Sequence, residues 1–77
     1  MRKCVVKLIW EEGVWRSETA DNDFCVVLES GSMDALIERV KIAVLDILET
    51  DFKYTGDIQF IFQAERVDNI KSNKAIA

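Results

Sequence analysis

The chain has 77 residues, a net charge of −4 at pH 7, two cysteines and no histidine. This length allows one domain with a small core, of a size that often gains stability by forming oligomers. The composition excludes a zinc site, which needs more cysteine or histidine ligands, and the scattered cations argue against binding to phosphate backbones.

The first predicted strand runs from Lys3 to Trp10 and is rich in β-branched and aromatic residues. Because side chains alternate along a strand, its wholly apolar face is expected to face the core. That face comprises Cys4, Val6, Leu8 and Trp10, and the mixed opposite face comprises Lys3, Val5, Lys7 and Ile9.

Two further strands are predicted at Val14 to Ala20 and at Phe24 to Glu29. The first hairpin turns at Gly13, which can supply the positive φ of a tight loop. The second turn falls on residues 21–23, where aspartate and asparagine side chains can hydrogen-bond their own backbone. The alternation of the third strand puts Cys25, Val27 and Glu29 on the face opposite to Phe24, Val26 and Leu28.

The longest element is a helix predicted from Met33 to Glu49, with Ser32 as its N-cap. Ile42 and Leu45 lie outside its apolar stripe, among acidic residues. They are either tolerated surface aliphatics or a small contact patch for another chain. The stripe itself follows the 3.6-residue period of an amphipathic helix and comprises Met33, Leu36, Ile37, Val40, Val44, Ile47 and Leu48.

The last predicted strand runs from Ile58 to Ala64 and completes a single domain over residues 1–66. Residues 67–77 are mostly polar and are predicted to form a flexible C-terminal tail. In the strand, Ile58, Phe60, Phe62 and Ala64 are expected to face the core, and Gln59, Ile61 and Gln63 to face away.

These elements predict a two-layer α+β fold, β-β-β-α-β, in which one helix covers one face of a four-stranded mixed sheet. A right-handed crossover places the last strand parallel to the first, which gives the strand order 3-2-1-4. The other face stays uncovered, and the two edge strands expose unpaired backbone groups. Six residues are candidates for contacts with another protein, and the alternative is that they are merely exposed surface. They are Val5, Ile9, Val27, Ile61, Ile42 and Leu45.

The sequence shows no catalytic arrangement. Without histidine, no Ser-His or Cys-His nucleophile pair can form. The acidic residues fall in separate turns, which predicts solvated surface and not a two-metal nuclease site. The side chains of Trp10, Phe60 and Phe62 could stack on RNA bases but are expected in the core. The sequence does not predict on which face of the sheet Trp15 lies. We therefore expect no enzymatic activity, no cofactor, no metal and no nucleic-acid binding by this chain alone.

The chain is expected to be cytoplasmic. No segment approaches the roughly 20 apolar residues of a membrane span, and Lys7 interrupts the apolar N-terminal run, which argues against a signal peptide. The two thiols suit a reducing compartment. Because Cys4 and Cys25 are predicted on opposite faces of the sheet, a disulfide between them is not expected.

The stretch from Val6 to about Phe62 resembles the HicB-like antitoxin superfamily, especially its small one-domain members of unknown function (domain-of-unknown-function family 1902). The resemblance lies in the Trp10–Trp15 hairpin, in the run Val26-Val27-Leu28-Glu29-Ser30, and in the helix start at residues 32–38. It implies a β-β-β-α-β domain related to a reduced ribonuclease-H-like sheet, and dimers. In the superfamily that the chain resembles, full antitoxins mask a small basic toxin that cleaves messenger RNA, and they repress their own operon.

The expected function is a non-enzymatic protein-interaction domain, resembling the toxin-binding half of a HicB-type antitoxin. It would be a homodimer that covers a small basic toxin-like protein, which the net charge of −4 suits, although a solvated acidic surface needs no partner. Residues 67–77 are too few for a DNA-binding element, so operator binding is not expected. The alternatives are a stand-alone structural or regulatory module, or an RNA-binding or degenerate nuclease-like domain.

Overall fold

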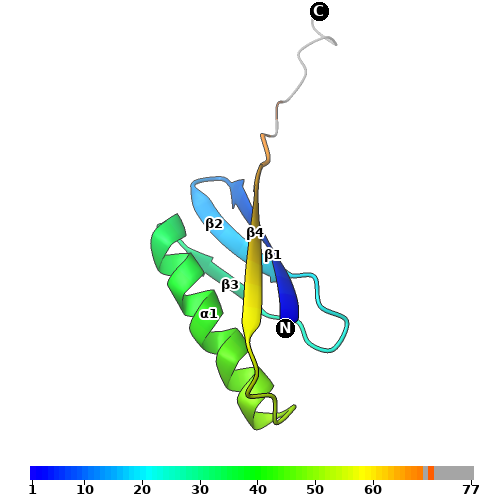
Figure 1. The fold of residues 1–77 in the computed structure, drawn as a ribbon. Helices are drawn as coiled ribbons and strands as arrows, with labels where there is room; N and C mark the ends of the chain where they lie inside the picture. Colours follow the sequence, from blue (N-terminus) through cyan, green and yellow to red (C-terminus); the bar gives the residue numbers. More distant parts are fainter. Residues whose placement is uncertain (69, 71–77) are drawn as a thin grey trace, which may run out of the picture.

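The computed structural model describes residues 1–68 and 70. Four strands and one helix follow in the order β1 (Arg2–Glu11), β2 (Val14–Thr19), β3 (Val27–Ser30), α1 (Met33–Thr50) and β4 (Ile58–Arg66). The strands form one sheet in the order β3-β2-β1-β4, with the helix on one face (Figure 1). The predicted α+β fold and its strand order are confirmed.

Strands β2 and β1 are the two central strands of the sheet. Strand β1 pairs with β2 in the antiparallel sense and with β4 in the parallel sense, and β2 pairs with β3 in the antiparallel sense. The two-residue loop between β1 and β2 has φ values of 55° at Glu12 and 81° at Gly13. Two consecutive left-handed residues are typical of a type I′ hairpin turn, and the expected positive φ at Gly13 is confirmed.

The core lies between the helix and the strands it covers. The helix begins after Ser32, whose side chain accepts a hydrogen bond from the Ala35 N–H at 3.3 Å, which confirms the predicted N-cap. The fully buried helix residues recur every fourth position, on one face of the helix. They are Leu36, Val40, Val44 and Leu48, and the buried residues of the same cluster outside the helix are Cys4, Val6, Leu8 and Val26.

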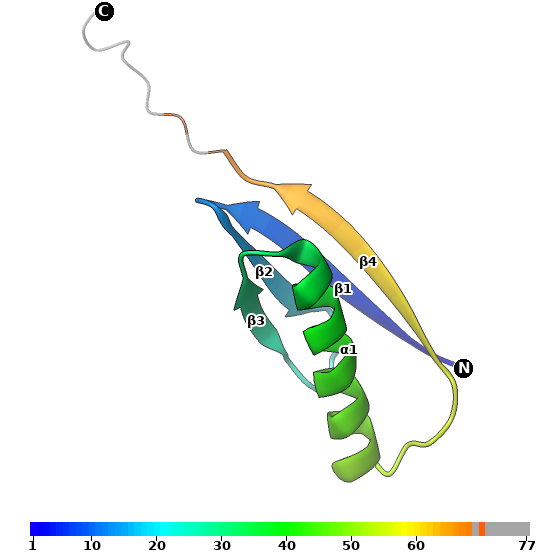
Figure 2. The same ribbon diagram turned by 90° about the vertical axis from the view of Figure 1, so that its left-hand side faces the viewer.

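The helix does not cover the sheet evenly. It packs on β2 and β3, and β4 runs along one side of it (Figure 2). On the helix-facing side, Cys4 of β1 is therefore buried, whereas its β4 neighbour Phe60 is only half-buried. Ala64 was predicted to face the core but is exposed, and Trp10 is only half-buried. Alternation along a strand sets the face of a residue, but not how far the helix reaches across that face.

The third strand begins later than predicted, at Val27 and not at Phe24. Val26 is nevertheless buried, and its backbone N–H donates a hydrogen bond to Thr19 Oγ1 at 2.9 Å. The Leu28 N–H donates in the same way to Ser17 Oγ at 3.2 Å. Side-chain hydroxyls on β2 thus accept hydrogen bonds from backbone donors of β3 and of the residue before it.

The chain continues past β4 in contact with β1, because the Val67 N–H donates a hydrogen bond to the Trp10 carbonyl at 2.9 Å. Most of the predicted flexible tail, residues 69 and 71–77, lies outside the described residues.

Candidate interaction surfaces

The uncovered face of the sheet offers less aliphatic surface than the sequence predicts. Val5 and Ile61 are half-buried and lie opposite each other on β1 and β4. Ile9 is only 7% exposed, which corrects the prediction that it is accessible on this face. Its neighbours on the adjacent strands are Arg16 and Glu65. Long charged side chains of this kind cover apolar surface with their methylene stems.

Val27, another predicted contact of this face, is 53% exposed but stands apart from Val5 and Ile61. In its row across the sheet, Glu18 on β2 and Lys7 on β1 separate Val27 from β4. The uncovered face is therefore a mosaic of charged and aliphatic side chains. The structure does not bring its predicted contacts together into one continuous apolar patch.

The two helix residues outside the apolar stripe are both exposed, Ile42 to 68% and Leu45 to 47%. Leu45 lies next to β4, because Leu45 and Ile58 line the same surface hollow. Glu49 and Tyr54 line that hollow as well. Leu45 thus lies at the boundary between the helix and β4.

Two aromatic rings lie on the helix-facing side of β4, next to the core. Phe60 and Phe62 are stacked, with their ring centroids 5.9 Å apart and their planes at 12°, and both are half-buried. Both rings pack against the core cluster, as the sequence predicts, but they remain only half-buried. The run from Ile58 to Ala64 contains no charged residue and no proline, which is the sequence signal of a strand able to pair with another chain.

The two edges of the sheet differ in how well they are protected. Strand β3 has four residues, and the Arg39 side chain of the helix donates a hydrogen bond to its Glu29 carbonyl at 2.9 Å. Strand β4 has nine residues, and within the described part of the chain no strand lies beyond it. We call the side of β4 that faces away from β1 the β4 edge, and the Phe60 and Phe62 rings border it on the helix-facing side of the sheet. An unpaired edge of this length is a template for pairing with another chain.

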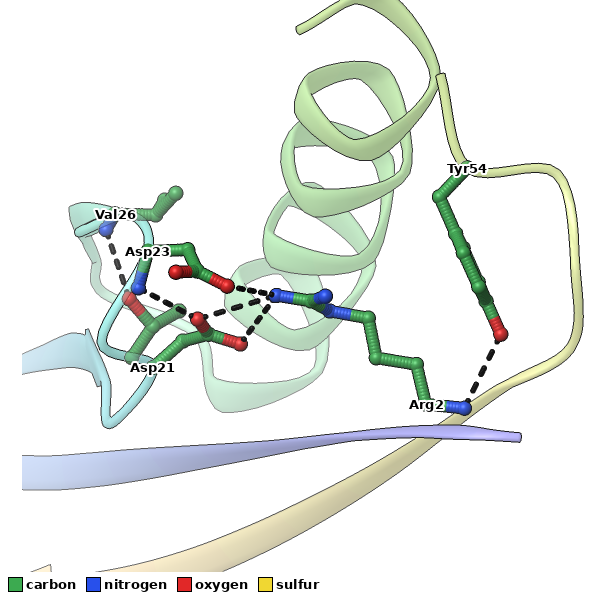
Figure 3. Close-up of polar contacts among 6 residues, drawn as sticks. Arg2, Asp21, Asp23, Val26 and Tyr54 are labelled. Carbon is green, nitrogen blue, oxygen red and sulfur yellow. Dashed lines mark hydrogen bonds and ion pairs between the residues drawn. The ribbon is translucent and has the colours of Figure 1, made fainter. Parts of the chain in front are cut away.

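A polar cluster surrounds Arg2 at the start of β1 (Figure 3). The Arg2 guanidinium forms ion pairs with Asp21 at 3.1 Å and Asp23 at 3.0 Å, and its carbon lies 5.9 Å from the ring centroids of Phe24 and Phe52. The pKa of Arg2 is raised, mainly because its guanidinium donates a hydrogen bond to Asp23. The cluster joins β1 to the turn before β3 and to the chain after the helix.

The Arg2 backbone is held in the same region. Its N–H donates a hydrogen bond to the Tyr54 hydroxyl at 3.2 Å, and this hydroxyl donates to the Asp57 carbonyl at 2.7 Å. The acidic turn at residues 21–23, predicted as solvated surface, thus provides the ion-pair partners of Arg2. The contacts of this cluster are internal to the domain, and we assign it a structural role.

The two cysteines are both free, with Cys4 buried and Cys25 exposed. Burial is the main cause that raises the pKa of the Cys4 thiol. Among the described residues, no group of three or more cysteine, aspartate or glutamate side chains could hold a metal ion. In the same part of the chain, no helix has both the length and the apolar character that a membrane crossing requires.

The fold and these surfaces define a small α+β domain with one helix-covered face and one unprotected sheet edge. A family model described as "Domain of unknown function (DUF1902)" matches residues 3–72, and the chain belongs to this family. No curated protein and no solved structure matches the chain. The family membership confirms one part of the predicted resemblance, and it carries no link to HicB-like antitoxins.

Proposed function

We propose that this chain is a non-enzymatic protein-interaction domain, which forms a homodimer and covers a small basic protein as the toxin-binding half of a HicB-type antitoxin does. The observation that carries the proposal is the β4 edge. A long unpaired strand bordered by half-exposed rings is suited to binding protein, because its main-chain groups give affinity and its side chains give specificity.

The charge distribution supports a basic partner. The chain carries a net charge of −4, and a surface hollow at the end of the first hairpin is lined by Glu11, Glu12 and Glu29 around Arg16. Two ion pairs engage this arginine, with Glu11 at 3.9 Å and with Glu18 at 3.3 Å. Acidic side chains still outnumber the cation there, and opposite potentials steer the encounter of two proteins.

The proposal leaves out catalysis because the chain lacks the residues of common nucleophilic sites. It has no histidine, the buried Cys4 thiol has a raised pKa, and a raised pKa lowers the fraction of reactive thiolate. The most conspicuous polar cluster, around Arg2, is used for internal ion pairs.

Co-expression with the product of the neighbouring reading frame tests the proposal. We expect a small basic protein to co-purify with the tagged chain at a fixed ratio, and the complex to weaken as salt is raised from 50 to 300 mM because exposed charge pairs are screened at about this ionic strength. The absence of a basic protein from the neighbouring frame, together with the absence of any complex, would contradict the antitoxin-like role. It would favour a stand-alone structural or regulatory module.

A pair of charge variants identifies the surface that is used. The double change Glu12→Gln and Glu29→Gln removes two charges at the hairpin hollow, and Glu38→Gln with Asp46→Asn removes two charges from the exposed side of the helix. Because both variants change the net charge equally, a weaker complex in the first variant alone assigns the contact to the hollow. Equal weakening in both would point to a general effect of net charge.

A further inference from the structure

We infer that two copies of this chain pair through the β4 edge, antiparallel, about a two-fold axis at Phe62, so that two four-stranded sheets join into one continuous sheet. The inference deepens the homodimer part of the proposed function and rests on that part alone. It is independent of whether a basic partner exists. It is argued from the direction of the backbone groups, the order of side chains along β4 and the charge of the two edges.

The backbone of β4 has its free hydrogen-bonding groups on residues with even numbers. The Arg2 N–H donates to the Asp57 carbonyl at 3.0 Å, and the Val67 N–H donates to the Trp10 carbonyl at 2.9 Å. Since N–H and C=O groups alternate in direction along a strand, the odd-numbered residues between these two positions face β1. The even-numbered residues, Phe60, Phe62 and Ala64 among them, direct their groups to the open edge.

Antiparallel pairing about Phe62 places even-numbered residues opposite even-numbered residues. Phe62 then meets Phe62 of the second copy, and Phe60 meets Ala64. These are positions whose free N–H and C=O groups can bond to each other, as residues of a hydrogen-bonded antiparallel pair do. The same register keeps the helix-facing side chains of both copies on one face of the joined sheet, so the Phe60 and Phe62 rings of both copies form one aromatic strip.

Charges along β4 favour this register over the one with its axis at Ile61. With the axis at Phe62, Glu65 lies opposite Gln59 of the second copy. Moving the axis to Ile61 keeps the backbone groups matched but places Glu65 opposite Asp57, and like charges directly opposite each other destabilise a strand pair. At the ends of the pairing, Arg66 lies opposite Ile58 of the second copy, which lines a hollow with Glu49.

A second copy is the occupant that this edge fits best. Two chains that each carry a net charge of −4 repel each other over most of their surfaces, so they require a contact without charge. The run from Ile58 to Ala64 has no charged residue, and it is apolar or aromatic at most positions. The β3 edge does not offer such a contact, because it is short and has Glu29 bound by Arg39.

Sedimentation or light scattering on the purified chain tests the inference without any partner. We expect the wild-type chain to have twice its 8.8 kDa mass at micromolar concentration. Phe62→Lys and Phe62→Glu should each be monomeric, because each puts like charges together at the axis, with a dissociation constant raised at least about 100-fold. An equimolar mixture of the two variants should form a dimer again, because opposite charges then meet.

Val27→Lys is the matched control, because it adds the same charge next to the other edge of the sheet, at a residue that is 53% exposed. We expect it to leave the dimer intact. Circular dichroism checks that each variant is folded. Should the Phe62 variants fail to fold, Ala64→Pro tests whether the β4 edge forms the dimer contact. This change removes an N–H that points to the open edge, and it should also give a folded monomer.

Two results would overturn the inference: a wild-type chain that is monomeric at about 100 µM, above most specific dissociation constants, or a dimer that survives both the Phe62 and the Ala64 changes. A monomer that still binds a basic protein would refute the β4 pairing and leave the partner-binding role intact. A dimer that depends on Phe62 but binds no basic protein would refute the partner-binding role alone.

Discussion

The two edges of the sheet differ in every property that protects a strand from a second chain. The β3 edge has four residues, one of its carbonyls is bonded to Arg39, and the helix packs over it. The β4 edge has nine residues, and its central run is uncharged and lies beside the helix. Natural sheets shorten, charge or cover edges that must stay single. By this comparison, β3 has the protection of a strand that ends a sheet, and β4 lacks it.

The offset position of the helix is the physical origin of this difference. A helix centred over the sheet would cover β1 and β4 alike, but this helix packs on β2 and β3 and buries the core-facing residues of β1 without fully covering β4. Cys4 is consequently 1% exposed, whereas its neighbour in the register, Phe60, stays half-buried. The position of the helix therefore accounts both for the closed core and for the incomplete cover over Phe60 and Phe62.

The largest expected effect compares the two sides of the helix. Leu36 is fully buried against the sheet, and Leu36→Ala should lower the free energy of unfolding by about 2–5 kcal/mol through lost burial and a cavity. Leu45 is 47% exposed on the side towards β4, and Leu45→Ala should lower it by less than about 1 kcal/mol. Urea denaturation monitored by tryptophan fluorescence measures both, and similar losses would show that Leu45 is packed as tightly as Leu36.

The next effect compares the two directions of the β4 backbone. Gln63→Pro removes an N–H that points towards β1, and it should lower the free energy of unfolding by about 1–3 kcal/mol because a ladder bond is lost. Ala64→Pro removes an N–H that points to the open edge and should be clearly milder in the monomer. Thermal unfolding of both variants at low concentration gives the comparison, and the reverse order would disprove the assigned backbone directions.

A smaller effect concerns the protection of β3. Arg39→Ala removes the hydrogen bond to the Glu29 carbonyl, and because Arg39 is exposed we expect a loss of at most about 1 kcal/mol in unfolding free energy. Amide hydrogen exchange should become faster in β3 and stay unchanged in β4. Arg39→Lys, which keeps a charged donor, is the control. Faster exchange in both strands would mean that Arg39 stabilises the whole domain.

The smallest effect tests the covered face through Cys4. Burial raises the pKa of this thiol in the folded state, so the folded state favours the protonated form. Its contribution to stability is therefore fully present below the thiol pKa of the unfolded chain, about 8.5, and is lost as pH rises above that value. Urea midpoints at pH 7 and pH 9.5 measure the loss. Cys4→Ala should remove this pH dependence and Cys25→Ser should keep it, and a dependence that follows Cys25 would contradict the assignment.

Much of the fold was predictable because local patterns and chain order agree. The apolar period fixed the helix to within one residue at its C-terminal end, Ser32 fixed its start, and Gly13 marked the hairpin. The start of β3 was not predictable from local pattern, because the Val26 N–H just before it bonds to the Thr19 hydroxyl across the sheet. Nor was the role of Arg2, whose partners lie about 20 residues away in the sequence.

For the candidate surfaces, the sequence determined which residues share a face, because alternation and helical period are properties of the local chain. The predicted pair Val5 and Ile61 does lie side by side on the uncovered face. Tertiary structure alone decided how much of each residue stays accessible. Ile9 became buried between Arg16 and Glu65, and Phe60 and Phe62 became a half-exposed strip, because burial depends on what packs against a face and on how far that neighbour extends.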